Sequence, residues 1–387
     1  MFVCAFNTNI DHVVRLSGNM VEALCRDVGC DFETPPSSIE DEADVLSALL
    51  HCMRKGVGRE VVIDDPAPIE RLGLSGVDRL GGNAANSAAG LAALGCPALL
   101  NVAAPSRRQM ALIPSGVHVP LDAHSEIDLV HSVLEFTRGD VVHIGSERVV
   151  VPESDRLIIT YDPLNTRMVV SKAFEEELLE GLEGVSAALA SGFHLLKRRR
   201  DAHEVVALLR RVHALRPELR IHSELGSPAD VGVLKDVLSS LRGVLFSISM
   251  NEQEATELFG GSWSSVEARQ RMHEFFEHME MHTLCVHSTH VVYCMSREPE
   301  VAERAAQLGA RCAGVLALCG HVSRDNLDIP LATSVKGMRT IAHLSPLEWD
   351  GHVEVLVPTY HVEHRATSTG LGDAFTAGFL KVLGESS

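Results

Sequence analysis

Apolar strand-like runs alternate with helix-forming stretches through the second half of the sequence, and this alternation limits the possible folds most strongly. RIHSEL (220–225), GVLFSISMNE (243–252) and TLCVHSTH (283–290) each follow a stretch with helical periodicity. Strand–helix–strand units of this kind connect through right-handed crossovers and build parallel strands. MFVCAFNTNID (1–11) adds a buried strand that ends in polar residues. We therefore predict an α/β fold with a mostly parallel sheet flanked by helices.

Two other regions have a different pattern and indicate a second, smaller unit. Residues 12–70 contain a helical patch, and residues 115–165 contain short β-like pieces separated by turn signals. We expect these segments to form a small sheet outside the main layers. The large α/β domain then takes approximately residues 1–11, 71–114 and 166–387, and the two domains form one functional unit.

The overall composition excludes several classes of protein. A formal net charge of −18 argues against sequence-independent binding to nucleic acid, which needs clustered Lys and Arg side chains. The longest stretch of low polarity, 84–104, is interrupted by Asn, Gly and Pro, which disfavours a membrane span. The nine cysteines include no CxxC pair, and the N-terminus does not resemble a signal peptide. We expect a soluble protein of the reducing cytoplasm, with neither a nucleic-acid nor a membrane partner; its oligomeric state stays open.

STGLGDAFTAGF (368–379) carries the clearest candidate for chemistry. Gly370, Leu371 and Gly372 form a turn that enters a helix, whose first amides are unpaired and can bind an anion. Asp373 falls in the first helical turn, where the positive helix end favours its ionised form. A carboxylate beside an anion site is suited to take a proton from a nucleophile that attacks phosphorus. An ordinary helix start with an acidic dipole partner also explains the motif, which is not a Walker A loop because no GK[ST] follows.

Polar side chains alternate along the end of the first expected strand. Asn7, Asn9 and Asp11 are spaced by two, so on an extended strand they share one face. Amides and a carboxylate can bind the hydroxyls of a sugar, although Asn and Asp also commonly end strands without binding anything.

Paired glycines precede an Ala-rich helix in RLGGNAANSAAGLAALG (79–95). Gly81 and Gly82 allow a ligand to approach the backbone closely, and Asn83 is either a helix cap or a ligand contact. Packing of the helix on the sheet accounts for the alanines but not for the glycines.

Acidic residues follow two of the expected central strands. Glu224 alternates with His222 at a strand end, and Asn251 and Glu254 are three apart where a helix begins. Hard oxygen ligands suit Mg²⁺, which keeps several waters and takes one or two carboxylates plus substrate phosphates. A capping-box-like helix start is the alternative for Asn251 and Glu254.

KRRR (197–200) is the only dense basic run, and it follows an apparent strand. Lys197 and Arg198 at a strand's carboxyl end are candidates for holding a sugar phosphate. The alternative is that the run is the solvated start of a helix.

Together NTNID, GGNAANSAAGLAALG, HSE, NEQE and STGLGDAFTAGF resemble, in this order and over nearly the whole chain, the archaeal ADP-dependent sugar kinases. These are the glucokinase and phosphofructokinase branch of the ribokinase-like superfamily. The resemblance implies a Rossmann-like domain, a smaller β-containing lid that closes over the sugar, and transfer of the β-phosphoryl group of ADP to a sugar hydroxyl, leaving AMP. The lid corresponds to approximately 12–70 and 115–165.

The same resemblance implies roles for single residues. Asp373 corresponds to the catalytic base, the amides of 370–373 to the anion hole, and Glu224 and Glu254 to groups that hold the Mg–nucleotide, partly through water. The remaining positions, on the sugar-binding elements or the stretch that frames the nucleotide, are Asn9, Asp11, Gly82, Asn83, Asn251, Pro358, Thr359 and Thr369.

We expect fructose 6-phosphate as the acceptor, because KRRR supplies positive charge that a neutral sugar would not require. Glucose, or both sugars, is the nearest alternative. Two further alternatives are an ATP-using ribokinase-like kinase of a sugar or nucleoside and a non-catalytic sugar or nucleotide sensor. Asp373, Glu224 and Glu254 are all present, as catalysis requires.

Overall fold

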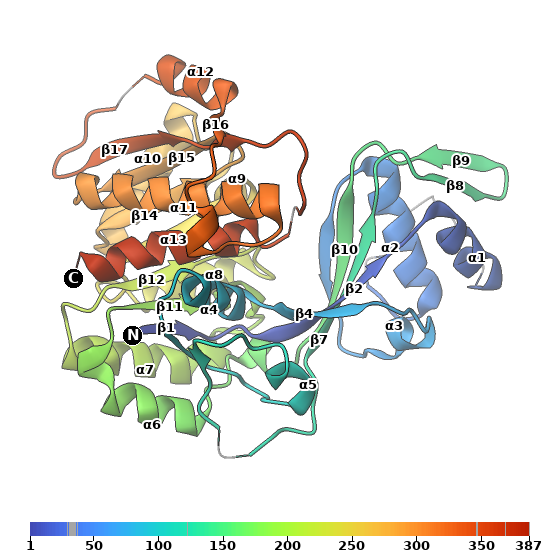
Figure 1. The fold of residues 1–387 in the computed structure, drawn as a ribbon, viewed down its shortest axis with the longest axis horizontal. Helices are drawn as coiled ribbons and strands as arrows, with labels where there is room; N and C mark the ends of the chain where they lie inside the picture. Colours follow the sequence, from blue (N-terminus) through green and yellow to red (C-terminus); the bar gives the residue numbers. More distant parts are fainter. Residues whose placement is uncertain are drawn as a thin grey trace.

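The protein has two lobes, a larger one built on a nine-stranded sheet and a smaller one built on a five-stranded sheet (Figure 1). The computed structural model describes residues 1–28, 30, 36, 38–121, 123–345, 347–367 and 369–386. None of the helices in these ranges is long and apolar enough to cross a membrane.

The large sheet is mostly parallel, as the alternating pattern predicts. Its strand order is β17-β15-β14-β13-β12-β11-β1-β5-β6, with every pair parallel except β14 with β15 and β15 with β17. The strands are β1 (Phe2–Ala5), β5 (Ala98–Leu100), β6 (Val117–His118), β11 (Ala187–Ser191), β12 (Ile221–Glu224), β13 (Ser247–Asn251), β14 (Thr283–His287), β15 (Val291–Ser296) and β17 (Val353–Pro358). The runs predicted as strands at 220–225, 243–252 and 283–290 therefore lie side by side in the centre of this sheet.

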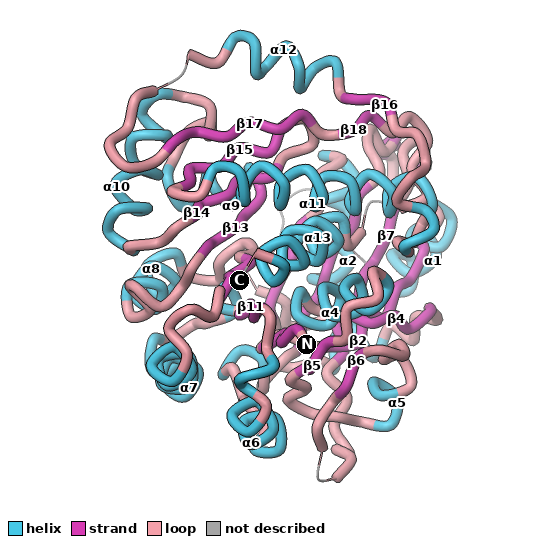
Figure 2. Tube along the Cα trace, turned by 60° about the vertical axis from the view of Figure 1, so that its left-hand side comes forward, coloured by secondary structure: helices cyan, strands magenta, loops and turns pink. Residues whose placement is uncertain are grey.

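Helices cover both faces of the large sheet and build a core on each side (Figure 2). Alternate side chains of β1 divide between them: Val3 and Ala5 belong to one core, and Phe2 and Cys4 to the other. The first core takes helices α6 (Lys172–Glu180), α7 (His203–Leu215), α8 (Val231–Ser239), α9 (Glu252–Phe259) and α10 (Val266–Met279). The second takes α4 (Asn83–Ala93), α11 (Pro299–Cys319) and α13 (Leu371–Glu385). The α/β class expected from the sequence is confirmed.

The smaller lobe is a mixed sheet with helices on its outer face. Its strand order is β3-β10-β7-β2-β4, and its strands are β2 (Asn9–Arg15), β3 (Arg59–Val62), β4 (Val77–Gly81), β7 (Val130–Phe136) and β10 (Asp155–Tyr161). Apolar residues of this sheet form a separate core with α1 (Gly18–Val28), α2 (Glu42–Lys55), α3 (Ala67–Arg71) and the hairpin β8 (Val141–Ile144)–β9 (Glu147–Val150). Helix α2 matches the predicted helical patch and begins at a capping box made by Asp41 and Asp44.

Two strands lie in a different sheet from the one we predicted. Val77–Gly81 falls in the segment 71–114 that we placed in the large domain, but it pairs antiparallel with β2 in the small sheet. Val117–His118 falls in the predicted lid segment 115–165, but it pairs with β5 in the large sheet. The sequence of a short strand does not indicate which sheet it joins, because its pairing with a neighbouring strand depends on contacts distant in sequence. The remaining short elements are α5 (Arg107–Met110), α12 (Val335–His343), β16 (Ala332–Thr333) and β18 (Tyr360–His361).

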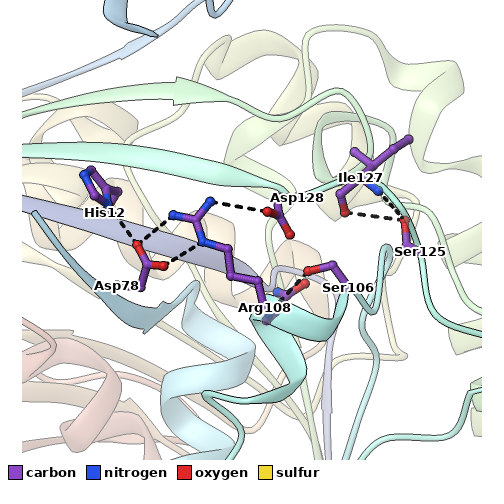
Figure 3. Close-up of polar contacts among 8 residues, drawn as sticks. His12, Asp78, Ser106, Arg108, Ser125, Ile127 and Asp128 are labelled. Atoms are coloured by element: carbon purple, nitrogen blue, oxygen red, sulfur yellow. Dashed lines mark hydrogen bonds and ion pairs between the residues drawn. The ribbon is translucent and has the colours of Figure 1, made fainter. Parts of the chain in front are cut away.

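A polar network connects the lobes beside β4 (Figure 3). Arg108, on α5, donates two hydrogen bonds to the carboxylate of Asp78 on β4, at 2.6 and 2.8 Å. It also donates to Asp128, just before β7, at 3.3 Å, and His12 Nδ1 lies 2.8 Å from Asp78 Oδ1. The Arg108 guanidinium therefore joins α5 to two segments of the small lobe, and His12 on β2 is connected to it through Asp78.

Candidate active site

A cleft of about 650 Å³ lies between the lobes, above the carboxyl ends of the parallel strands. Its floor includes Glu224 at the end of β12, Asn251 at the end of β13 and His287 at the end of β14, while β3 and β10 of the small sheet form the opposite wall. Ligands of open α/β sheets bind at this edge. The N-terminus of α13 opens into the same space through residues 370–373.

Asp373 is held at the start of α13 by the amides of another helix. Gly370 precedes α13 with φ 74°, a left-handed conformation that favours glycine. Asn83 Nδ2 donates to Asp373 Oδ1 at 3.1 Å, and Asn86 Nδ2 donates to Asp373 Oδ2 at 3.0 Å. Burial and the nearby charge of Glu224 raise the pKa of Asp373 to about 7, although both amides act in the opposite direction. A carboxylate with a pKa in this range is well matched to proton transfer near neutral pH.

Glu224 and Glu254 carry negative charge into the same cleft. Glu224 is buried; burial alone would raise its pKa, but the His287 imidazole, 2.9 Å away, and the Ser249 hydroxyl outweigh burial and lower it. Glu254 accepts from the backbone and side-chain amides of Asn251 at 2.7 and 2.6 Å, so the expected capping box is present. Burial and the charge of Glu224 raise the pKa of Glu254 to about 7.

The single strand expected for residues 1–11 is divided in two, since β1 ends at Ala5 and Asn9 and Asp11 begin β2 of the small sheet. The connection between the two strands approaches Asp373 through Asn83. Asn7 Nδ2 donates to Asn83 Oδ1 at 3.2 Å, and Asn9 Nδ2 donates to Asp11 Oδ1 at 2.7 Å. Asp11 lies with Asp373 around a side cavity of about 310 Å³. Besides Asp373, only Asn83 of these residues lines the main cleft itself.

The paired glycines lie against the β1–β2 connection and the start of β2. A Cβ on Gly81 would come within 2.2 Å of Asp11 Oδ1, and one on Gly82, where φ is 89°, within 2.5 Å of the Asn7 carbonyl oxygen. Close packing of β4 on β2 therefore requires Gly81, and the close approach of Gly82 to Asn7, with its positive φ, requires the second glycine.

A second, more apolar pocket of about 400 Å³ adjoins the cleft over α13. It is lined by small side chains of α11, by Phe375 and by Thr359, and it shares Asn251, His287 and Gly372 with the cleft. Of the other residues predicted to frame a nucleotide, Thr369 lines the side cavity, Pro358 ends β17, and Ser368 in the same stretch lies outside the described residues.

Lys197 and Arg198 do not line the cleft that holds Asp373. They border a separate cavity of about 400 Å³, where Lys197 Nζ lies 3.3 Å from Asp64 Oδ1 and Arg198 Nε lies 2.8 Å from Asp201 Oδ2. The cations that do line the cleft are Arg59 on β3 and Arg156 on β10. The sequence did not predict a role for these two arginines. The residues around each arginine do not indicate that the β3–β10 edge of the small sheet lies against the large lobe.

Three more lining residues were also missed. His194 is buried, its Nδ1 has no hydrogen-bond partner among the described residues, and burial lowers its pKa. His287 forms the ion pair with Glu224, which together with other acidic groups raises the His287 pKa against the effect of burial. Glu60 accepts from Thr160 Oγ1 at 2.8 Å. His287 lies in the predicted strand run 283–290 and ends β14, a position at the carboxyl edge of the sheet that marks it as a candidate.

Comparison with known proteins assigns this chain to a family. Residues 1–381 match the family model described as the ADP-specific phosphofructokinase/glucokinase conserved region. The chain is 24% identical to an ADP-specific phosphofructokinase of Thermococcus zilligii, over 97% of this chain and 93% of the relative. It is 26% identical to an ADP-dependent glucose/glucosamine kinase of Pyrococcus furiosus, over 65% and 60% of the two chains. A solved ADP-dependent kinase in complex with fructose-6-phosphate and ADPbetaS matches with a TM-score of 0.81 and 20% identity, over 99% of this chain and 94% of the other. The chain belongs to the ADP-specific phosphofructokinase/glucokinase family.

Proposed function

We propose that the protein transfers the β-phosphoryl group of ADP to a hydroxyl of a sugar or sugar phosphate, with fructose 6-phosphate as the best candidate acceptor, and releases AMP. The observation that carries this proposal is the position of Asp373 and Gly372 at the start of α13, where the polar cleft and the apolar pocket meet. An adenosine group fits the apolar pocket, an acceptor fits the cleft, and the phosphoryl group then lies at their junction. The family's description supports ADP as the donor.

In this mechanism Asp373 takes the proton of the acceptor hydroxyl as the oxygen attacks phosphorus. The bond from the β-phosphorus to the bridging oxygen breaks, and AMP leaves. The unpaired amides at the start of α13 stabilise the charge of the transferred group. Asn83 and Asn86 orient the base, since each donates to one of its oxygens. Most of the rate enhancement then comes from positioning and electrostatics.

The cleft fits a divalent cation such as Mg²⁺. Glu224 and Glu254 are buried, and the charge of Glu224 helps to raise the pKa of Glu254, so a cation near both carboxylates would offset their repulsion. Their oxygens already accept hydrogen bonds, which favours contact partly through water. When bound, Mg²⁺ would neutralise charge on the nucleotide phosphates.

Arg59 and Arg156 support a phosphorylated acceptor, in place of the Lys197 and Arg198 that the sequence favoured. Guanidinium groups bind phosphate oxygens well, and this pair is on the small-sheet wall, opposite Asp373. Glucose is the second candidate, because Glu60 on the same wall would repel a phosphate and accept hydrogen bonds from neutral hydroxyls.

The test is release of AMP from ADP with fructose 6-phosphate, glucose and ribose, in parallel with release of ADP from ATP. We expect turnover with ADP and fructose 6-phosphate. Replacing Glu60→Gln should improve the ratio of kcat/KM for fructose 6-phosphate to that for glucose. Turnover with ATP alone would contradict the proposed donor, and no turnover with any pair would contradict the kinase assignment. Nine cysteines without a CxxC pair agree with a reducing compartment, which we propose to be the cytoplasm.

A further inference from the structure

A second group of titratable side chains lies away from the cleft, where α10 meets the start of β17. His273 and Glu277 are one helical turn apart on α10, and His352 directly precedes β17. One potential ligand atom of each residue lies within 4.8 Å of those of the other two. None of the three lines the cleft or the apolar pocket. This group, which we call the α10–β17 cluster, has no part in the proposed reaction.

Three ring nitrogens of the α10–β17 cluster lack a well-formed hydrogen bond. Nδ1 of His273 and both ring nitrogens of His352 are buried without one to any described residue, and the Asp350 backbone interacts with His352 only weakly. The side chain of His352 is 0% exposed, and its Nδ1 is 3.6 Å from Glu277 Oε1, beyond hydrogen-bond distance. Native proteins rarely leave buried polar atoms unpaired, because burial without a partner costs free energy. A cation among the three side chains would supply the missing partner.

We propose that His273, Glu277 and His352 bind a transition-metal ion of the zinc class. Two imidazoles and one carboxylate are ligands that Zn²⁺ prefers, whereas Mg²⁺ and Ca²⁺ prefer oxygen alone. Ligands at i and i+4 of one helix lie on one face, which allows α10 to supply two of the three. Water would complete a tetrahedral shell.

The geometry requires only a small closure around the ion. Zinc–ligand bonds of about 2.0–2.1 Å separate the ligand atoms of a tetrahedral site by about 3.3 Å, so the side chains must approach somewhat from their spacing of up to 4.8 Å. Glu277 is 41% exposed, which gives the ion a path from solvent. Arg297 donates to Glu277 Oε1 at 2.8 Å and orients the carboxylate, leaving Oε2 without a hydrogen bond to any described residue.

Aromatic stacking is the competing explanation for the α10–β17 cluster. The rings of His273 and His352 have centroids 5.0 Å apart, and the His273 ring stacks on Trp349 at 4.2 Å. Stacking orders the rings and needs no metal. It does not, however, provide hydrogen-bond partners for the ring nitrogens. Metal content therefore distinguishes the two explanations.

The bound ion would act as a structural tie. Arg269 on α10 already donates to Glu354 on β17 at 2.7 Å, and the metal would add a second connection between the same two elements. A ligand that binds only the folded state raises its stability. At a free Zn²⁺ concentration 100 times the dissociation constant, the melting temperature should rise by about 3 °C for a chain of this size.

The experiment uses the tag-free, full-length chain, stripped with a chelator and dialysed against a small excess of Zn²⁺ over protein in a larger excess of Mg²⁺. We expect one zinc per chain by mass spectrometry and the rise in melting temperature. Co²⁺ in place of Zn²⁺ should give the intense visible bands of a tetrahedral site, which the oxygen ligands of the cleft would not produce. Glu277→Gln and His352→Phe should lose both the zinc and the bands, and the phenyl ring preserves the stacking.

The matched controls are Glu274→Gln and His278→Gln, exposed neighbours on α10, and both should bind metal like the wild type. Wild-type protein that retains no more zinc than Glu277→Gln would overturn the proposal. So would a zinc content or a cobalt spectrum that survives in both ligand variants. Because the cluster lies outside the cleft, sugar phosphorylation can fail or succeed independently of this result.

Discussion

Asn83 Nδ2 lies 3.1 Å from Asp373 Oδ1, and this contact joins the first residue of α4 to the first turn of α13 across 290 positions of sequence. Asn86, one turn further along α4, holds the other oxygen. The carboxylate is thereby fixed in orientation while its pKa stays near neutrality. Because this base is partly protonated at neutral pH, its titration should appear in the pH dependence of the reaction rate.

The activity of the wild type should rise with pH through about 7. The pKa of Asp373 is raised to about 7 by burial and by Glu224, and the base must be ionised to accept a proton. Below that pH, kcat/KM for the sugar should fall about tenfold per unit of pH. The measurement is initial rate at low sugar concentration between pH 5 and 9, at saturating nucleotide and constant ionic strength. A profile that is flat through this range would contradict the role of Asp373.

Replacing Asn86→Ala should move that profile toward alkaline pH. The Asn86 amide favours the ionised form of Asp373, so its loss raises the pKa further, by about one unit for a hydrogen bond to a charged group. At pH 9 the variant should approach the wild-type rate, whereas at pH 6.5 it should be several-fold slower. A matched control is Asn326→Ala, whose amide donates to the His321 carbonyl oxygen away from the cleft; its profile should be unchanged. An acid shift in Asn86→Ala would be the wrong sign for this account.

Replacing Arg156→Ala should weaken binding of a phosphorylated sugar selectively. Loss of a charged contact to phosphate corresponds to about 1.5–3 kcal/mol, or a KM for fructose 6-phosphate higher by about 10- to 150-fold. The KM for glucose should change little. Lys197→Ala is the control, because its ammonium lies at the separate cavity beside Asp64. If Lys197→Ala raised the KM and Arg156→Ala did not, the phosphate would bind where the sequence alone suggested.

Replacing Arg108→Ala should reduce the free energy of unfolding in a pH-dependent way. The Arg108 hydrogen bonds lower the pKa of Asp78 to about 2, below its value of about 3.9 in unfolded chains. The stability from this shift is present above about pH 4 and is lost as the pH falls through 2. Because Arg108 is 40% exposed, we expect only about 1 kcal/mol at pH 7.

Urea unfolding of the Arg108 variant and the wild type at several pH values tests this prediction. Arg138→Ala is the control, since its pair with Glu153 is 3.7 Å apart and exposed on both sides. The difference in free energy of unfolding between Arg108→Ala and the wild type should become smaller as the pH falls. A difference that grows on acidification would rule out the Asp78 contact as its source.

The sequence predicted the large lobe well because its signals are local. Each central strand is a short apolar run after an amphipathic helix, and parallel strands bring their carboxyl ends to one edge. Glu224 and Glu254 follow two of these strands, so their approach to one another required no knowledge of distant contacts. The start of α13 was likewise recognisable from its glycines and its run of helix formers.

The wall formed by the smaller lobe was not predictable in the same way. Arg59 and Arg156 reach the cleft only because the small sheet turns one edge toward α13, which depends on packing between segments far apart in sequence. KRRR is the only dense basic run in the sequence, yet its first two side chains pair with Asp64 and Asp201. Local charge density therefore identified a basic surface and missed the two arginines that line the cleft with Asp373.

Transfer of label from ADP carrying β-³²P, in a single turnover with fructose 6-phosphate, tests the central claim most directly. The account predicts that label leaves ADP and enters the sugar in equal amount, with unlabelled AMP as the other product. Asp373→Asn should bind the nucleotide as the wild type does and slow this transfer by about 10²- to 10⁴-fold, the usual share of a general base. Transfer at the wild-type rate in Asp373→Asn, with label still reaching the sugar, would contradict the claim.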